Sequence, residues 1–271
     1  MDRVLFDISL GFYLISTSGY LAALLIKRVF VARISTWLLA GAFAFHTAAL
    51  LAQHLLSGQT ILAGLFASLS FFAWAVTGSY LLFQLRTKTI VLGAIVSPLV
   101  LLLNVTSSLQ FHRHGLLPQI LQGPLVTAHV VLSLMGEALF VLVALAGMLY
   151  LLQDYNIRHR RLHAMSRLLP PLKDLDQINH LGLLIGFPIL TLGLLTGSVW
   201  AAEVWGSHWP WDPKLTWAFF FWLGYAFLLH QRLAIGWSGR RSAFCAVVFL
   251  FLMLASLSVV GLLLPTIHTF R

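Results

Sequence analysis

Residues 125–153 read LVTAHVVLSLMGEALFVLVALAGMLYLLQ, a run in which Glu137 is the only formally charged side chain. A helix that crosses a bilayer needs about 20 mostly apolar residues, because each backbone amide inside the hydrocarbon must find its hydrogen-bond partner within the same segment. This run is therefore predicted to span a membrane. Hydrophobic residues make up 59% of the 271 residues, charged residues only 9%, and the mean hydropathy is +0.90. The chain is predicted to be an integral membrane protein.

Eight stretches meet this requirement of length and composition. They predict an all-α fold, a polytopic helical bundle of about eight transmembrane helices that forms a single membrane domain over residues 1–271. The first stretch is expected to be a retained span and not a signal peptide, because Lys27 and Arg28 follow it and no A-x-A-like site ends it. The expected spans are Val4–Ile26, Ile34–Leu56, Ile61–Phe83, Thr89–Phe111, Leu125–Gln153, Leu175–Trp200, Lys214–Ile235 and Ser242–Leu264.

The basic residues predict the orientation of the chain. Thirteen of the 17 lysines and arginines lie in or beside the odd-numbered connections between spans. Because such residues in short loops stay in the cytoplasm, both termini and the connection between the sixth and seventh spans are predicted to face away from it. The net charge of +9 follows from this asymmetry and from the scarcity of acids, so membrane lipid and no nucleic acid is expected as a partner. The lone Cys245 lies in the eighth span, so any thiol chemistry must belong to a partner.

The connection Trp205–Pro213, WGSHWPWDP, is the most unusual segment of the chain. His129 near the start of the fifth span and His268 after the eighth span are expected at the same membrane surface. Two imidazoles can ligate an iron from opposite sides of a porphyrin, and indole rings can stack against its plane. An interfacial tryptophan belt is the alternative. The density of the motif and the two distant histidines favour a haem site.

The segment Gly186–Arg241 contains this motif and resembles the WWD-containing haem-handling proteins. Among these it is most similar to the CcsA (ResC) cytochrome c assembly proteins, which are related to CcmC and to HemX- and YpjD-like membrane proteins. The resemblance is close over residues 125–268, the haem-handling core with its WWD loop, and weak over residues 1–124. The decisive pattern is W-G-x-x-W-x-W-D-P-K followed by a tryptophan.

The resemblance implies a function in cytochrome c biogenesis. Haem b would be held at the outer face by His129 and His268 as axial ligands, and His230 would belong to a haem site nearer the cytoplasm. Haem would then be attached to the CxxCH thiols of apocytochrome c. The chain would act as a component of a haem lyase complex in a bacterial cytoplasmic (inner) membrane or an equivalent energy-transducing membrane. A CcsB/ResB-type partner with a large outer domain would supply another intramembrane histidine. The implied haem platform consists of Trp205, Trp209, Trp211, Asp212 and Trp217.

The residues also suggest a second pair of iron ligands. His180 in the sixth span and His230 in the seventh lie at similar depths near the cytoplasmic face, and antiparallel neighbours could bring them together. We hypothesise that they ligate haem within one chain; a hydrogen-bonded structural role for His180 is the alternative. The sixth span also carries a glycine stripe, predicted to pack against another helix, and His180 points away from it. The stripe consists of Gly182, Gly186, Gly193 and Gly197.

The roles of three more polar groups at membrane depth stay open. His46 is either a ligand or a neutral imidazole bonded to a carbonyl or hydroxyl. Glu137 either tunes the outer histidine or carries a proton, or has a structural partner; the role of His54 is open. Two other function classes also remain. One is a HemX/YpjD-like regulatory or structural membrane protein, and the other is a transporter that moves haem or another solute without attaching it.

Overall fold

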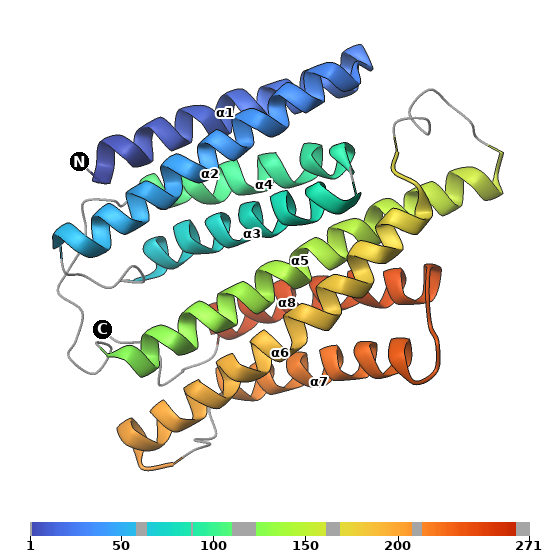
Figure 1. Cartoon of the computed structure of the whole chain (residues 1–271). Helices are drawn as coiled ribbons and strands as arrows, with labels where there is room; N and C mark the ends of the chain where they lie inside the picture. The colour runs from blue at the N-terminus through green and yellow to red at the C-terminus, as the bar shows by residue number, and fades with distance from the viewer. Residues whose placement is uncertain are drawn as a thin grey trace.

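The computed structural model describes residues 2–57, 64–87, 89–109, 123–160, 169–207 and 213–263, which form eight α-helices and no strand (Figure 1). The predicted all-α, polytopic bundle is confirmed. Helices α1 to α6 are long and apolar enough to cross a membrane. The helices are α1 (Asp2–Ile26), α2 (Val29–Ser57), α3 (Leu65–Thr87), α4 (Ile90–Ser108), α5 (Pro124–Arg158), α6 (Leu172–Trp205), α7 (Pro213–Leu233) and α8 (Arg240–Leu263).

Two helices extend well beyond their predicted spans. α5 has 35 residues and α6 has 34, which at 1.5 Å per residue gives about 50 Å each, against about 30 Å for the hydrocarbon core of a bilayer. Hydropathy marks the part of a helix that lies in lipid, whereas the polar residues next to it can continue the same helix. The added turns carry polar groups, among them Asp154 and Asp174.

The C-terminal end of α6 is fixed by a glycine. Gly206 has a φ of 68°, in the left-handed region that favours glycine, and its N–H donates to the carbonyl of Ala202 at 3.0 Å. This is a common way for a helix to end, because it satisfies a carbonyl that the helix would otherwise leave without a donor. The helix therefore ends immediately after Trp205, at the start of the tryptophan-rich connection.

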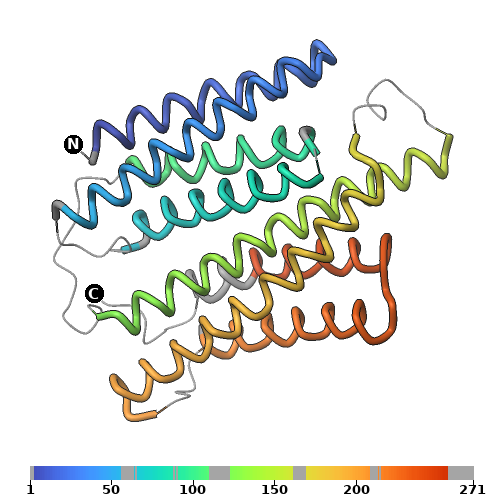
Figure 2. Tube along the Cα trace, viewed as in Figure 1, coloured from blue at the N-terminus to red at the C-terminus, as the bar shows by residue number. Residues whose placement is uncertain are grey.

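α5 lies at the centre of the bundle. It packs most extensively against α6 and also contacts α8, α3 and α4. The tube in Figure 2 shows α1 to α4 on one side of α5 and α6 to α8 on the other. The N-terminal end of α1 lies at the same end of the bundle as the first turns of α5 (Figure 1). One end of the bundle thus gathers the start of α5, the end of α6 and the start of α7.

Candidate functional site

His129 is held at the interface of α5 and α6. The imidazole is partly buried, and its Nδ1 lies 2.7 Å from the carbonyl oxygen of Gly193 on α6. A carbonyl can only accept a hydrogen bond, so Nδ1 must carry the proton. In a neutral imidazole the lone pair then lies on Nε2, the form in which Nε2 can bind a metal. The chemistry of this donor therefore fits haem iron.

The glycine stripe of α6 packs closely against another helix, as predicted, and that helix is α5. A Cβ atom on Gly193 would lie 2.7 Å from the Ser133 hydroxyl oxygen, and a Cβ on Gly197 would overlap the imidazole of His129. Further along the helices, Gly186 and Gly182 face Leu139 and Val143 in the same way. Glycine allows the α6 backbone to approach closely enough for the Gly193 carbonyl to reach the imidazole.

Tryptophans from α6 and α7 lie at this same end of the bundle. Trp205 contacts Trp200 edge to face, with ring centroids 5.1 Å apart and an interplanar angle of 73°. Trp200 lies one turn beyond Gly197, which contacts His129, so it adds an aromatic side chain that was not among the predicted site residues. Trp217 in α7 is 40% exposed and contacts Phe220 and Phe221.

Four of the predicted site residues lie outside the described part of the chain. They are Trp209, Trp211 and Asp212 in the connection before α7, and His268 after α8. Their roles stay predictions. Among the described residues, the structure brings His129 to the end of the bundle at which α6 ends with Trp205.

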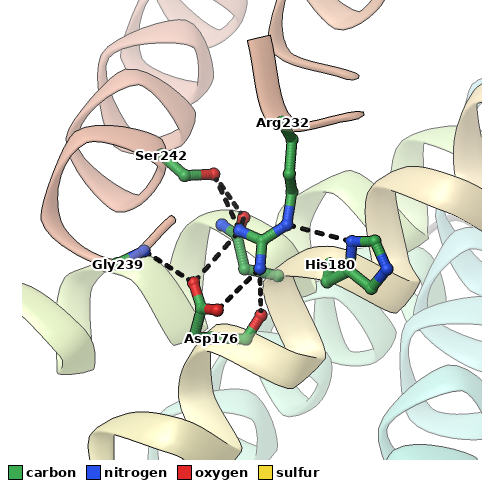
Figure 3. A network of polar contacts seen from close by, with 6 residues as sticks. Asp176, His180, Arg232, Gly239 and Ser242 are labelled. Carbon is green, nitrogen blue, oxygen red and sulfur yellow. Dashed lines mark hydrogen bonds and ion pairs between the residues drawn. The ribbon is translucent and has the colours of Figure 1, made fainter. Parts of the chain in front are cut away.

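The opposite end of the bundle holds a polar network centred on Arg232 of α7 (Figure 3). Its guanidinium binds both carboxylate oxygens of Asp176 on α6, at 3.0 and 2.7 Å, and also its backbone carbonyl. It donates further to Asn179 and, at 3.2 Å, to Ser242 at the start of α8. The backbone N–H of Gly239 donates to Asp176 at 2.8 Å. The network ties α6, α7 and α8 together.

The same guanidinium contacts His180. Arg232 Nε donates to Nδ1 of His180 at 3.0 Å. The lone pair of His180 is thus engaged at Nδ1, which leaves the proton on Nε2. Of the two interpretations of His180, haem ligand or hydrogen-bonded structural residue, this contact favours the structural one.

Arg232, not His230, is the α7 residue that meets His180. Residues two apart on a helix point in directions about 200° apart. Because Arg232 points into the bundle, His230 lies on the other side of α7, where it is exposed. The hypothesis that the two histidines share one iron is therefore not supported by this geometry, and His230 remains a predicted ligand without His180. No partner for Arg232 was predicted from the sequence, because this residue was counted only among the basic residues of a cytoplasmic connection. Asp176, an acid at a similar depth on the preceding span, was the feature of the sequence that could have indicated the ion pair.

His46 is fully buried among hydroxyl groups. The Tyr13 hydroxyl donates to Thr77 at 3.3 Å, so it accepts from Nδ1 of His46 at 3.2 Å, and Nε2 accepts from Ser70 at 2.9 Å. The hydroxyl-bonded interpretation of His46 is confirmed. The buried Tyr225 hydroxyl donates to the backbone carbonyl of Gly136, the residue before Glu137, at 3.4 Å, and the roles of Glu137 stay predictions.

His46→Leu is expected to lower the free energy of unfolding by about 1–3 kcal/mol, because the buried hydroxyls of Tyr13 and Ser70 lose their partner. Thermal unfolding in detergent measures this change. The haem content of the purified protein should not change, since both ring nitrogens are already hydrogen-bonded to hydroxyls. Loss of haem from a folded His46→Leu protein would contradict the structural role.

A profile of the Cytochrome C assembly protein family matches residues 62–268 of the chain. The chain belongs to this family. Cytochrome c biogenesis proteins CcsA of this assembly family are similar to it in sequence. The protein from Chlamydomonas reinhardtii is 36% identical over 199 residues, covering 71% of this chain and 55% of that relative. The protein from Prochlorococcus marinus subsp. pastoris is 30% identical over 245 residues, covering 82% and 78%. The predicted resemblance to CcsA is therefore confirmed.

A solved structure shares the fold of this assembly-family chain. It is the cytochrome c haem lyase CcmF, with a TM-score of 0.69 and 19% sequence identity. The match covers 98% of this chain and 47% of CcmF. The chain thus spans about half the length of CcmF and of the Chlamydomonas relative. The family match begins at residue 62, so it extends well before Leu125, where the stretch of close resemblance was predicted to begin.

Proposed function

We propose that this protein binds haem b at the outer end of α5 and α6 and presents it for covalent attachment to apocytochrome c. The observation that carries the proposal is the hydrogen bond from His129 Nδ1 to the Gly193 carbonyl. Histidines that ligate metals almost always donate their second ring N–H to such an acceptor, which fixes the ring and makes the ligating nitrogen more basic. His129 already has this partner in the folded chain.

In this proposal the side chains position haem and exclude water. His129 and His268 are the two axial ligands, which hold the iron and set its reduction potential. Indole rings pack on the porphyrin face. The Asp212 carboxylate orients a ligand or interacts with charge that develops at the site. Haem is the cargo, and the thiols of the apocytochrome add to its vinyl groups, so the reacting nucleophile belongs to the substrate. The indole platform consists of Trp205, Trp209, Trp211 and Trp217.

The inner haem site of this proposal uses His230. Because this imidazole is on the exposed side of α7, its iron must take a second ligand from outside the described part of this chain. A CcsB/ResB-type partner with an intramembrane histidine would supply it, as the family resemblance implies. The proposed location is a bacterial cytoplasmic membrane or an equivalent energy-transducing membrane, and the proposed activity is that of one component of a haem lyase complex.

The test is the absorption spectrum of the protein purified in mild detergent from cells that make haem, oxidised and reduced with dithionite. The unaltered protein should show a low-spin spectrum typical of two histidine ligands, and His129→Ala and His268→Ala should each weaken it or make it high-spin. His46→Leu serves as the control. A haem-free protein, or a spectrum that neither substitution changes, would reject the haem site and favour a HemX/YpjD-like regulatory role.

A further inference from the structure

The buried face of α1 carries hydroxyl groups. Side chains with a hydroxyl recur every three or four residues along this face, so they lie on one side of the helix. A polar group inside a membrane protein is costly unless it has a hydrogen-bond partner. Each of these hydroxyls is therefore expected to have one. They belong to Ser9, Tyr13, Ser16, Thr17 and Tyr20.

Two of these hydroxyls belong to hydrogen-bonded clusters between helices. The Tyr13 hydroxyl bonds to Thr77 on α3 and to the buried imidazole described above. The Tyr20 hydroxyl lies 3.1 Å from that of Tyr80 on α3 and 2.8 Å from that of Thr36 on α2. Tyr13 and Tyr20 are separated by about 10 Å along α1, at 1.5 Å per residue. The two clusters thus lie at different depths in the bundle.

Between the clusters, two hydroxyl oxygens have no hydrogen-bond partner among the described residues. They are Oγ1 of Thr17 on α1 and Oγ of Ser97 on α4, and these residues are only 5% and 0% exposed. Ser9, on the same face of α1, instead donates to the carbonyl of Phe6 at 2.7 Å. Buried polar groups in folded proteins are almost always paired, either with protein or with ordered water.

Thr17 and Ser97 lie at a similar depth. A Cβ atom on Gly93 of α4 would overlap the ring of Tyr20, so these two residues are in contact. Helices α1 and α4 run in opposite directions (Figure 1). Thr17 precedes Tyr20 by three residues and Ser97 follows Gly93 by four. These offsets are rises of about 4.5 and 6 Å in the same direction along the bundle.

The Thr17 side chain is turned toward α4. Adjacent residues on a helix point about 100° apart, and Ser16 donates to the carbonyl of Ser35 on α2 at 2.8 Å. Thr17 is therefore turned away from α2, and besides α2 the helix α1 packs chiefly against α4. On α4, Ser97 lies one turn from Gly93 and thus on the face that contacts α1.

A third hydroxyl is available at this depth. Tyr80 of α3 also contacts Gly93. Because α3 is antiparallel to α4, Thr77 is displaced from Tyr80 in the same direction as Ser97 is from Gly93 (Figure 1). The Thr77 hydroxyl donates to a carbonyl of its own helix at 2.8 Å and accepts from Tyr13. One lone pair of its oxygen is left for another donor.

We propose that Thr17, Ser97 and Thr77 bind an internal water molecule that bridges α1, α3 and α4. A buried water makes about three hydrogen bonds, typically to polar groups that otherwise lack a partner. Three neutral hydroxyls suit water and not a metal cation, whose charge would lack compensation inside the bundle. The water extends the hydrogen-bonded cluster of Tyr13 toward that of Tyr20. The site is separate from the proposed haem sites and does not depend on them.

The test is a double-mutant cycle of Thr17→Val and Ser97→Ala in the full chain, measured by thermal unfolding in detergent. Each substitution removes a hydroxyl and changes the volume little, so the fold is retained. Each single variant should lower Tm by about 2–4 °C, because the water loses a partner and the other hydroxyl is left less well bonded. The double variant should lose little more than one single variant, since the same water is lost only once.

Ser9→Ala is the matched control, because the Ser9 hydroxyl is equally buried but bonded within α1. Its effect should add to that of Thr17→Val. If either Thr17→Val or Ser97→Ala leaves Tm unchanged or raises it, the hydroxyl it removes has no partner at all and the proposal is wrong. Additive losses in the double variant would also overturn it, since the two residues would then share no ligand. A higher Tm in sodium chloride than in potassium chloride, lost in both single variants, would replace the water by a cation.

Discussion

Replacing Arg232 by methionine is expected to lower the free energy of unfolding by about 3–5 kcal/mol. The substitution keeps an apolar chain of similar length but removes every guanidinium donor that now binds Asp176, whose carboxylate keeps the Gly239 N–H but loses its charged partner in a partly buried site. Breaking a buried ion pair from one side has a cost of this order, because the remaining charge loses its compensation. Asn179 and His180 lose a donor as well.

Thermal unfolding in detergent provides the measurement, and a fall in Tm on the order of 10 °C is expected. Arg158→Met is the matched control, because Arg158 also pairs with an aspartate, Asp154, yet its side chain is 58% exposed. An exposed pair contributes at most about 1 kcal/mol. Arg232→Lys should recover only part of the loss, since an ammonium cannot reproduce the forked contacts of a guanidinium. If the two methionine variants unfold at the same temperature, the network does not stabilise the bundle.

Gly197→Ala is expected to weaken haem binding at the proposed His129 site by about 10–100-fold, the range for losing a group that orients a metal ligand. The added methyl group would occupy the space of the His129 imidazole. Either the ring rotates or α6 moves away, and both changes break the hydrogen bond from His129 to the Gly193 carbonyl. The fold should persist, because alanine is a better helix former than glycine.

Haem titration of the apoprotein, followed by absorbance, measures the affinity. Gly182→Ala is the control: it lies on the same stripe, where the methyl group would press on Val143, far from His129. A similar loss of haem affinity in both variants would mean that general loosening of the α5/α6 contact, and not the position of His129, determines binding.

The sequence predicted the helices better than the contacts between them. Apolar runs located all eight helices, because the cost of an unpaired amide in lipid leaves few alternatives. Helix ends were placed less well, since residues such as Asp154 continue a helix beyond the membrane. The spacing of the glycines predicted close packing along α6, but not that α5 would be the partner.

Side-chain partners across helices could not be predicted from depth alone. His180 and His230 are at similar depths, but His230 and Arg232 point to opposite sides of α7. The rotation of α7 about its own axis therefore decides which of these two side chains meets His180. That rotation is set by the buried face of the whole helix, including Tyr225 and Leu228. For His129, the sequence predicted a ligand, whereas the carbonyl that fixes its tautomer became visible only in the folded bundle.

The close contact between α5 and the glycine stripe of α6 has a mechanical consequence. From Gly182 to Gly197 the glycines add no side chain of their own, so α5 side chains such as Val143 and His129 pack directly on the α6 backbone over about 22 Å at 1.5 Å per residue. Such a pair slides little, since the α5 side chains are packed against backbone and have no free space in which to rearrange. It therefore behaves as a rigid rod that keeps the His129 end and the Asp176 end at a constant separation, so any movement during a working cycle falls to the helices packed around it.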